Sequence, residues 1–535
     1  MSSLPPMAGL LGLSVFLSSA FASPTPVIHR RAGAITWRSC SSEFNTTTLG
    51  AMCGNLDVPL DYTGKESSEM LQLDLIKIPA TKGVPRGSIM FNPGGPGLPG
   101  NEWLDSSAAL LLAATGGQHD LISFNPRGTG KTLPVICFDE QDPQDALKRL
   151  AIEERLSHTG NSSDVAQGRI WATSLQISEA CAKKNADNGR FLGTAFVARD
   201  IIQIVDALEE DGLLRYWGMS YGTLLGATLI AMFPERIDQI VLDGVVNPYL
   251  WWQSYSEDQL DDMDATFGEF LSQCVANADQ CPLAGNRRNQ TSQDLEVTVR
   301  DLLEHLKYNP IVIPDSATLF DYSALKNAIF ASMYGPDLWP ALGRGLDILL
   351  TTPLNTAALA QLVTFWKSIF GDLSPYATLS IRCSDKVQRE ESLDDMLEKI
   401  KPIRESSWLG GDAIDATSMI CARWPFEAAE RYLGDFNFKT AATPPLVMSK
   451  TFDPVTPLVS ARNVTAGFDG VLLEIEGGGH ASMAQPSTCA FKAVREYFGE
   501  GRLPRPGTKC DNDIGYFQSP EAVLEAWAKL LLALE

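Results

Sequence analysis

The sequence has 535 residues and a formal net charge of −22. Its 44% hydrophobic and 20% charged residues are ordinary globular values, and its length predicts two domains or one domain with a large insertion. Because an acidic surface repels phosphate backbones and anionic lipids, we expect neither nucleic acid nor a membrane as a partner.

The N-terminal segment has the pattern of a secretion signal. Residues Met7–Phe21 form an apolar run too short to span a bilayer, and Ala20-Phe21-Ala22 has the small-residue pattern of a signal-peptidase site. The Pro-rich stretch that follows ends with Arg30-Arg31, which is typical of a propeptide cleaved at a dibasic site. We therefore predict a signal peptide over residues 1–22, a propeptide over 23–31 and a secreted, extracellular mature protein.

The cysteine content fits an oxidising compartment. The ten cysteines are an even number and no CxxC or HxxxH pair is present, so disulfides are expected and a metal site is not. Four N-x-[ST] sequons are expected to carry glycans in a secreted chain, at Asn45, Asn161, Asn289 and Asn463.

Short apolar runs alternate with helical patterns from about Leu71 to Val246. The helical patterns cover Val197–Leu208 and Tyr221–Phe233. The apolar runs do not alternate with polar residues, which is typical of strands buried on both faces of a parallel sheet. The predicted strands are Leu71–Ile78, Ser88–Asn92, Leu121–Asn125, Leu214–Gly218 and Gln239–Asp243.

The pattern changes after Tyr249, where helical periods dominate as far as about Tyr432. Strand patterns return at Leu446–Ser449 and Val471–Ile475, and Pro520–Leu534 reads as a closing amphipathic helix. We therefore predict an α/β fold with a mostly parallel central sheet and a large, mainly helical cap inserted before the last strands. The expected boundaries are residues 32–248 for the first part of the core, 249–432 for the cap and 433–535 for the second part of the core.

The motif Gly218-Met219-Ser220-Tyr221-Gly222 matches G-x-S-x-G. It lies between a predicted strand and a predicted helix, which is the setting of a nucleophile elbow in an α/β-hydrolase. The flanking glycines remove side chains that would crowd the sharp turn. A glycine-rich turn with an incidental serine is the alternative, but the setting favours Ser220 as the nucleophile.

A serine nucleophile requires a base and a carboxylate that orients the base. His480 follows the strand Val471–Ile475 in a glycine-rich loop, whereas His119, His158 and His305 lie in less suitable places. Asp453 follows the strand Leu446–Ser449. The order Ser220, Asp453, His480 is the order of the α/β-hydrolases, so these three residues are the predicted catalytic triad.

An oxyanion hole requires backbone N–H groups that point at the developing charge. Tyr221, which follows the nucleophile, is expected to supply one. The loop Asn92-Pro93-Gly94-Gly95-Pro96-Gly97 is expected to supply the other, and because prolines have no N–H we favour Gly95. The segment Gly128-Thr129-Gly130-Lys131-Thr132 resembles the end of a phosphate-binding loop, but the required first glycine is Asn125, so nucleotide binding is not expected.

Together these residues resemble the tripeptidyl aminopeptidase branch of the α/β-hydrolases, which is related to the prolyl aminopeptidases. The resemblance covers roughly residues 35–515. It rests on FNPGGPG (91–97), YWGMSYGTLLG (216–226), FPERIDQIVLDGVVNP (233–248), FDPVTP (452–457) and LPRPGTKC (503–510).

The resemblance implies the same triad, a largely helical cap and release of short peptides from a free N-terminus, and similar fungal proteins are secreted. Departures from the family pattern occur at Asn125, at Leu98-Pro99-Gly100 and at Ala481-Ser482, and none removes a triad residue. Neighbour pairing of the cysteines gives Cys40–Cys53, Cys137–Cys181, Cys274–Cys281, Cys383–Cys421 and Cys489–Cys510.

The expected reaction is acyl transfer without a cofactor, in which tripeptides are released from free N-termini. An esterase, lactonase or amidase acting on a small molecule is the alternative, because it would use the same triad. A hydrolase fold that only binds is a third reading, which the complete triad disfavours. An acidic cluster at Glu257, Asp258, Asp261, Asp262 and Asp264 could bind the substrate ammonium, but a solvated helix face is the expected interpretation. The oligomeric state is left open.

Overall fold

Ten strands form one large sheet in the described part of the chain, in the order β1-β2-β3-β5-β4-β6-β7-β10-β11-β12. The computed structural model describes residues 33–40, 44, 49–64, 69–313, 319–352, 356–368, 375–437 and 443–534. The strands from β5 to β12 run parallel, and β1, β2 and β3 join them by antiparallel pairing. The strands of this sheet are β1 (Thr36–Ser39), β2 (Met52–Pro59), β3 (Met70–Ile78), β4 (Ser88–Asn92), β5 (Asp120–Phe124), β6 (Leu214–Met219), β7 (Ile237–Asp243), β10 (Leu446–Phe452), β11 (Val471–Gly478) and β12 (Lys509–Cys510).

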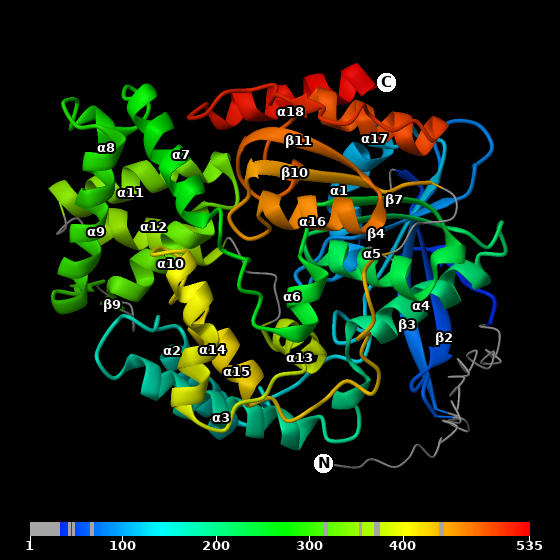
Figure 1. The fold of residues 1–535 in the computed structure, drawn as a ribbon, viewed down its shortest axis with the longest axis horizontal. Helices are drawn as coiled ribbons and strands as arrows, with labels where there is room; N and C mark the ends of the chain where they lie inside the picture. The colour runs from blue at the N-terminus through cyan, green and yellow to red at the C-terminus, as the bar shows by residue number, and fades with distance from the viewer. Residues whose placement is uncertain are drawn as a thin grey trace, which may run out of the picture. The chain divides into compact units, whose positions relative to one another are not determined.

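Helices cover both faces of this sheet, as Figure 1 shows. One apolar core lies under α4 (Thr194–Ala207), α5 (Tyr221–Met232) and α16 (Leu458–Phe468). The opposite core lies under α1 (Gly100–Ala114), α17 (Thr488–Glu500) and α18 (Pro520–Leu534). Strand β6 contributes Tyr216 to the first core and Trp217 to the second, because successive side chains of a strand point to opposite faces.

The sheet therefore confirms the expected mostly parallel α/β fold. The predicted direction of one strand is wrong. Strand β3 was predicted to lie in the parallel part, but it pairs antiparallel with both β2 and β5. Its burial alternates near its start, where Met70 and Gln72 are exposed and Leu71 and Leu73 are buried. Such alternation is typical of an antiparallel strand near the edge of a sheet.

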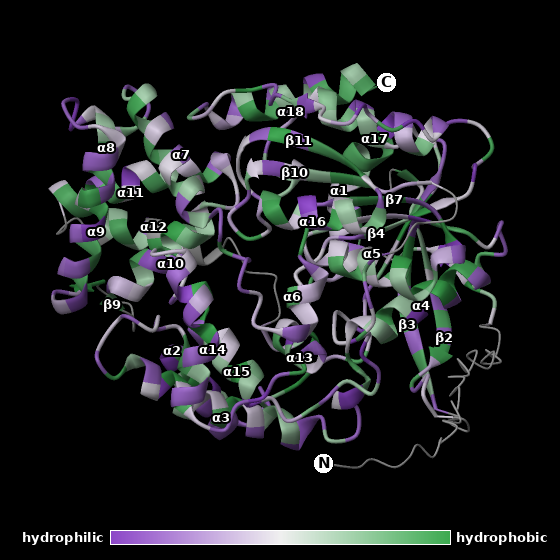
Figure 2. Cartoon of the chain, viewed as in Figure 1, coloured by the Kyte–Doolittle hydropathy of each residue, from purple (hydrophilic) through white to green (hydrophobic). Residues whose placement is uncertain are grey.

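The chain between β7 and β10 is mainly helical, with a short hairpin of β8 (Ile311–Val312) and β9 (Leu319–Phe320). Its helices carry one apolar side each, and Figure 2 shows green and purple residues on the same helix in α9. These helices are α6 (Pro248–Gln253), α7 (Met263–Ala276), α8 (Pro282–Gly285), α9 (Ser292–Tyr308), α10 (Tyr322–Ser332), α11 (Trp339–Thr351), α12 (Thr356–Ser368), α13 (Pro375–Asp385), α14 (Leu393–Ser406) and α15 (Asp415–Ala422).

Two helices from the first part of the chain pack with this helical region. Helices α2 (Pro143–Leu156) and α3 (Ala166–Lys184) contribute Ile152, Ile170 and Ile177 to its apolar core. Helix α3 packs against α15. The apolar core of the cap thus draws on residues outside 249–432, and the domain boundaries stay a prediction.

Five disulfides join the cysteines in the expected neighbour order, from Cys40–Cys53 to Cys489–Cys510. The Cys383–Cys421 bond links α13 to α15. The sequons at Asn161, Asn289 and Asn463 lie at exposed positions. The predicted signal peptide, the propeptide and the Asn45 sequon lie outside the described residues.

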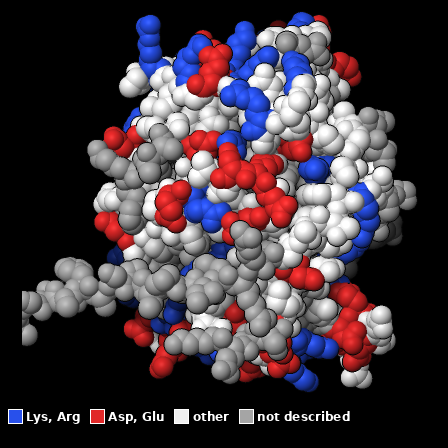
Figure 3. Space-filling view, turned by 90° about the vertical axis from the view of Figure 1, so that its right-hand side faces the viewer, with Lys and Arg blue, Asp and Glu red and all other residues white. Residues whose placement is uncertain are grey.

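Acidic and basic side chains are intermixed on the face of the molecule seen in Figure 3. The net charge of −22 is therefore not displayed there as a continuous acidic surface. Within the described residues, no helix is both long and apolar enough to cross a membrane.

Candidate active site

The three predicted catalytic residues follow three parallel strands of the sheet. Ser220 follows β6, Asp453 follows β10, and His480 lies two residues after β11. The carboxyl ends of parallel strands lie at one edge of a sheet, which is where ligands bind in open α/β folds. Because β6, β7, β10 and β11 are consecutive neighbours, this edge collects all three residues.

Ser220 occupies a sharp turn between β6 and α5. Its φ and ψ angles are 55° and −126°, and its backbone N–H donates to Asp243 O at 2.9 Å. A positive φ is unfavourable for a residue with a side chain, so the surrounding packing must hold this turn in place. Gly222 makes that packing close, since a Cβ there would lie 2.5 Å from the carbonyl oxygen of Asn92. This is the strained geometry of a nucleophile elbow.

His480 and Asp453 form a hydrogen-bonded pair. The His480 Nδ1 atom lies 3.0 Å from each carboxylate oxygen of Asp453, whose side chain is fully buried. The carboxylate also accepts the backbone N–H groups of Val455, Thr456 and Ala481. These bonds leave Nε2 as the ring nitrogen that can act on a serine, as a triad requires.

The charges of this pair stabilise each other. Burial by itself would lower the pKa of His480, but the Asp453 charge and hydrogen bond raise it above its usual value. Burial by itself would raise the pKa of Asp453, but His480 and the backbone donors hold it below its usual value. The pair is thus set to stabilise an imidazolium at His480.

Asp243 connects the serine turn to the histidine loop, a link that the sequence analysis missed. Its backbone oxygen accepts from Ser220, and its carboxylate accepts the N–H and the hydroxyl of Ser482 at 2.9 and 2.5 Å. Burial raises the pKa of Asp243 to about 6, against the opposing effect of Ser482. Its position at the end of β7, between the strands that carry Ser220 and Asp453, was the available signal.

The glycine loop after β4 lies against the serine turn. A Cβ on Gly94 would lie 2.9 Å from both Ser220 Cβ and Tyr221 N, so only glycine allows this approach. The Gly94 N–H already donates to Asn92 Oδ1 at 3.0 Å, and a cis peptide follows between Gly95 and Pro96. Since Gly94 is engaged, Gly95 and Gly97 remain as N–H donors of this loop for an oxyanion.

The side chain of Tyr221 is fixed from the cap, which the sequence analysis also missed. Its hydroxyl lies 2.6 Å from Thr194 Oγ1, which donates at 2.6 Å to Asp385 of α13. Trp251 of α6 packs on the Tyr221 ring at 5.5 Å and donates its indole N–H to the same carboxylate. No sequence spacing joins these four residues, so only the fold could reveal the contact.

The other histidines of the described chain lie elsewhere. His119 precedes β5 and thus lies at the opposite edge of the sheet, and burial lowers its pKa to about 4. His158 follows α2, and His305 belongs to α9. Among the described residues no group of His, Cys, Asp or Glu has the arrangement of a metal site.

The glycine-rich segment 128–132 forms a closed turn. Gly128 N donates to Thr132 O, and a Cβ on Gly130 would lie within 2.3 Å of the buried Asn125 side chain. The neighbouring Arg127 forms two hydrogen bonds with Asp200, and both side chains are fully buried. The contacts of this segment are those of a turn that supports the core.

The expectation of a solvated helix face for the acidic cluster is wrong for most of its members. Asp264 accepts hydrogen bonds from Ser407, Trp408 and Leu409 in the loop after α14. Asp258 accepts from Asn247 and Ser460, and Asp262 from the first residue of α16. Asp258 and Asp262 therefore tie the turns that precede α7 to the core, and Asp264 ties α7 to another part of the cap.

The fold and this arrangement of residues define an α/β-hydrolase, and comparison with known families agrees. Residues 87–339 match the family described as alpha/beta hydrolase fold, and residues 407–510 match the one described as TAP-like protein. The chain belongs to the α/β-hydrolases. Within them it is a TAP-like protein.

Its relatives include enzymes with different names. Serine protease Hip1 of Mycobacterium tuberculosis is 28% identical over 497 residues, which cover 89% of this chain and 91% of that protein. Tripeptidyl aminopeptidase of Streptomyces coelicolor is 32% identical over 230 residues, or 42% of this chain and 40% of that protein. Carboxylesterase B of Mycobacterium tuberculosis is 25% identical over 525 residues, or 95% of this chain and 94% of that protein.

Proposed function

We propose that Ser220, His480 and Asp453 are the catalytic triad of a serine hydrolase. His480 Nε2 takes the Ser220 proton while Oγ attacks the substrate carbonyl. The backbone N–H groups of Tyr221 and Gly95 stabilise the oxyanion. The leaving group departs with the proton from His480, and water then releases the acyl group from Ser220. The observation that carries this proposal is the buried His480–Asp453 pair at the same sheet edge as a serine held at positive φ.

The acyl group that we propose is a tripeptide released from a free N-terminus. Similarity to a tripeptidyl aminopeptidase and to a serine protease supports a peptide substrate. Cap residues also lie directly against the triad, since the Tyr334 ring is 5.1 Å from that of His480. Such cover favours a chain end over the interior of a folded protein, because an extended chain would have to pass through the cap.

An esterase acting on a small molecule is the second candidate. The similarity to carboxylesterase B over nearly the whole chain favours it, and the triad chemistry is the same. In both cases the protein is proposed to be secreted. The five disulfides support that location, since such bonds persist in oxidising compartments.

The first experiment asks whether Ser220 is the nucleophile. We expect a fluorophosphonate probe to label the full chain and Ser220→Ala to abolish the labelling. The matched control is Ser106→Ala, an exposed serine on α1 whose loss should leave labelling unchanged. Equal labelling of Ser220→Ala and the wild type would reject the assignment.

The second experiment separates the two candidate functions. Ala-Ala-Ala-anilide with a free N-terminus is compared with its N-acetylated form and with nitrophenyl esters. We expect the free peptide to be cleaved at least about a hundredfold faster than the blocked one, because an exopeptidase must pair the substrate ammonium with polar groups that an acetylated N-terminus leaves unpaired. Equal rates for free and blocked peptides would contradict an exopeptidase, and cleavage of esters alone would support the esterase.

A further inference from the structure

Arg382 lies on the face of α13 that points toward the proposed active site. Thr378, four residues earlier on the same helix face, donates its hydroxyl to Pro96 O at 2.6 Å, in the glycine loop of the proposed oxyanion hole. On the other side, Tyr334 is close enough to Arg382 to affect its pKa, and the Tyr334 ring packs on His480. Arg382 is therefore next to both halves of the site.

The guanidinium of Arg382 has neutral partners. Its Nη2 donates to Gln259 Oε1 at 2.5 Å, and its Cζ lies 4.9 Å from the centre of the Trp251 ring. In the part of the chain that the structure describes, no carboxylate forms an ion pair with it. Asp385 is near in sequence, but its carboxylate accepts hydrogen bonds from Thr194 and Trp251 instead.

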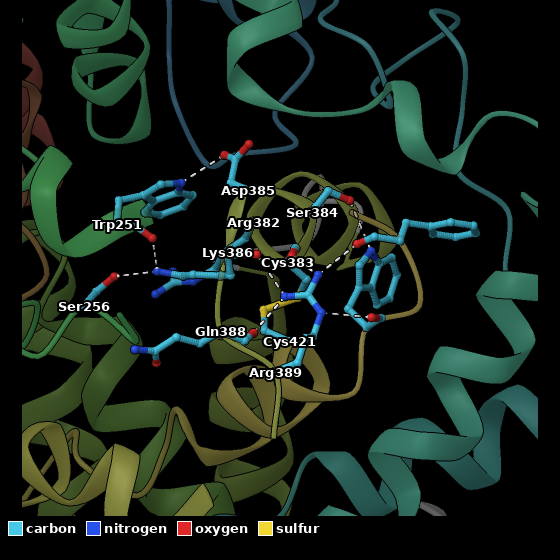
Figure 4. Close-up of a disulfide and its surroundings, with 12 residues drawn as sticks. Trp251, Ser256, Arg382, Cys383, Ser384, Asp385, Lys386, Gln388, Arg389 and Cys421 are labelled. Atoms are coloured by element: carbon cyan, nitrogen blue, oxygen red, sulfur yellow. Dashed lines mark hydrogen bonds between the residues drawn. A yellow bond between two sulfur atoms is a disulfide. The ribbon is translucent and has the colours of Figure 1, made fainter. Parts of the chain in front are cut away.

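A second cation lies one turn further along the chain. Lys386 is buried against the same Trp251 ring and donates to Trp251 O and Ser256 Oγ, as Figure 4 shows. Burial and the nearby Arg382 charge lower the pKa of Lys386 well below its usual value, against the opposing effect of Asp385, Glu257 and Asp258. Lys386 is 1% exposed, whereas Arg382 is half-buried and keeps part of its surface accessible.

The positive charge at Arg382 is thus uncompensated. Burial lowers the pKa of Arg382 to about 10, against the opposing effect of Tyr334, and the group stays protonated at neutral pH. A guanidinium binds a carboxylate through two parallel hydrogen bonds, and such bonds are stronger where water is partly excluded. A carboxylate is therefore the group that would pair with the Arg382 guanidinium.

We propose that Arg382 binds a carboxylate of the substrate and so makes the enzyme prefer peptides with an acidic side chain or a free C-terminus near the scissile bond. This inference rests on the proposed peptidase function. The competing explanation is a purely structural arginine that stacks on Trp251 and holds α13 in place. The two explanations differ in whether the preference for a carboxylate follows Arg382.

The test compares matched acid and amide substrates. Three pairs of tripeptide anilides carry Asp or Asn at the first, second or third residue, and a fourth pair is tetra-alanine with a free or an amidated C-terminus. We expect one pair to show a kcat/KM about tenfold to a hundredfold higher for the acid, mainly through KM, as for a charged hydrogen bond. The position of that pair identifies the source of the carboxylate.

Variants then assign the preference to Arg382. In Arg382→Gln the acid-to-amide ratio should fall to about one, and Arg382→Lys should keep part of it. Gln259→Glu would place a rival carboxylate on the guanidinium and should lower the ratio without removing the arginine. Arg502→Gln, an exposed arginine near the C-terminal end, is the control and should leave the ratio unchanged.

Several outcomes would overturn the proposed carboxylate site. A ratio near one for all four pairs in the wild type, or an unchanged ratio in Arg382→Gln, rejects it. If Arg382→Gln does not fold, an unchanged ratio in Gln259→Glu rejects it instead. If no peptide is cleaved, the proposed peptidase function is rejected. The role of Arg382 is then tested by measuring how well the same peptides protect Ser220 from labelling by the fluorophosphonate probe. Better protection by the Asp than by the Asn peptides, lost on substitution, supports the carboxylate site, and equal protection rejects it.

Discussion

The Nδ1 atom of His480 lies 3.0 Å from both carboxylate oxygens of Asp453, and this contact makes the pH dependence of activity predictable. The proposed reaction needs neutral His480, and Asp453 raises the pKa of the imidazole above its usual value of 6.5. Activity should therefore fall as the pH drops through a value above 6.5. In Asp453→Asn the charge that opposes the effect of burial on the His480 pKa is lost. The acidic limb of the pH–activity profile should therefore move to lower pH, and kcat should fall about a thousandfold or more.

The measurement is kcat/KM against pH for the wild type and for Asp453→Asn. Asp469→Asn is a control, because Asp469 ends α16 away from the triad and its loss should leave the limb in place. An acidic limb at the same pH in Asp453→Asn would show that Asp453 does not set the histidine pKa.

Gly94→Ala should reduce activity much more than stability. The added Cβ would lie 2.5 Å from Met219 O and 2.9 Å from Ser220 Cβ, so either the glycine loop or the serine turn must shift. Displacement of an oxyanion donor costs about a hundredfold or more in kcat. Gly501→Ala is the matched control, because Gly501 also has a positive φ but no atom within 4 Å of a new Cβ. Similar kcat values for the two variants would contradict the proposed place of the loop.

Asp200→Asn should destabilise the fold. The carboxylate and Arg127 are fully buried, and the remaining guanidinium would lose its charge partner, which costs about 3–5 kcal/mol in the free energy of unfolding. Asp279→Asn breaks an ion pair with Arg288 in which the Arg288 side chain is 66% exposed and the Asp279 side chain 76% exposed. This change should lower the free energy of unfolding by less than about 1 kcal/mol. Denaturant unfolding measures both, and equal costs would refute the argument from burial.

Two disulfides should differ in the stability that they provide. Cys383–Cys421 closes a loop with a sequence separation of 38, and Cys274–Cys281 closes one of 7. Loop-closure entropy in the unfolded chain predicts losses of roughly 4 and roughly 2.5 kcal/mol when each pair is replaced by serines. The first replacement should also weaken the proposed preference for a carboxylate, since Cys383 adjoins Arg382. An equal or reversed order of stability would show that strain or residual structure outweighs loop length.

The strands of the parallel sheet could be predicted because they are short, mostly apolar and bounded by turns. The predicted Ser88–Asn92 and the observed β4 have the same limits, and Leu214–Gly218 differs from β6 by one residue. Strands β1, β2 and β12 were not predicted, because β1 is mostly exposed, β2 carries polar residues and β12 has only two residues.

Some residues of the candidate site could likewise be predicted from the sequence, and others could not. The positions of Ser220, Asp453 and His480 followed from a motif, from strand ends and from their order along the chain. Thr194, Asp385 and Tyr334 could not be predicted, because each reaches the site by a contact between segments far apart in sequence. Arg382 reads in the sequence as one more charge on a helix, and only its neighbours reveal that the charge is uncompensated.

The placement of the cap between β7 and β10 has a consequence for synthesis of the protein. The ribosome makes the chain from the N-terminus, so Ser220 emerges while more than two hundred residues that include Asp453 and His480 are still missing. A nascent or truncated chain that ends within the cap carries the serine without its base. The proposed hydrolase can therefore become active only after nearly the whole chain has left the ribosome, which spares the cell that makes it from early hydrolysis.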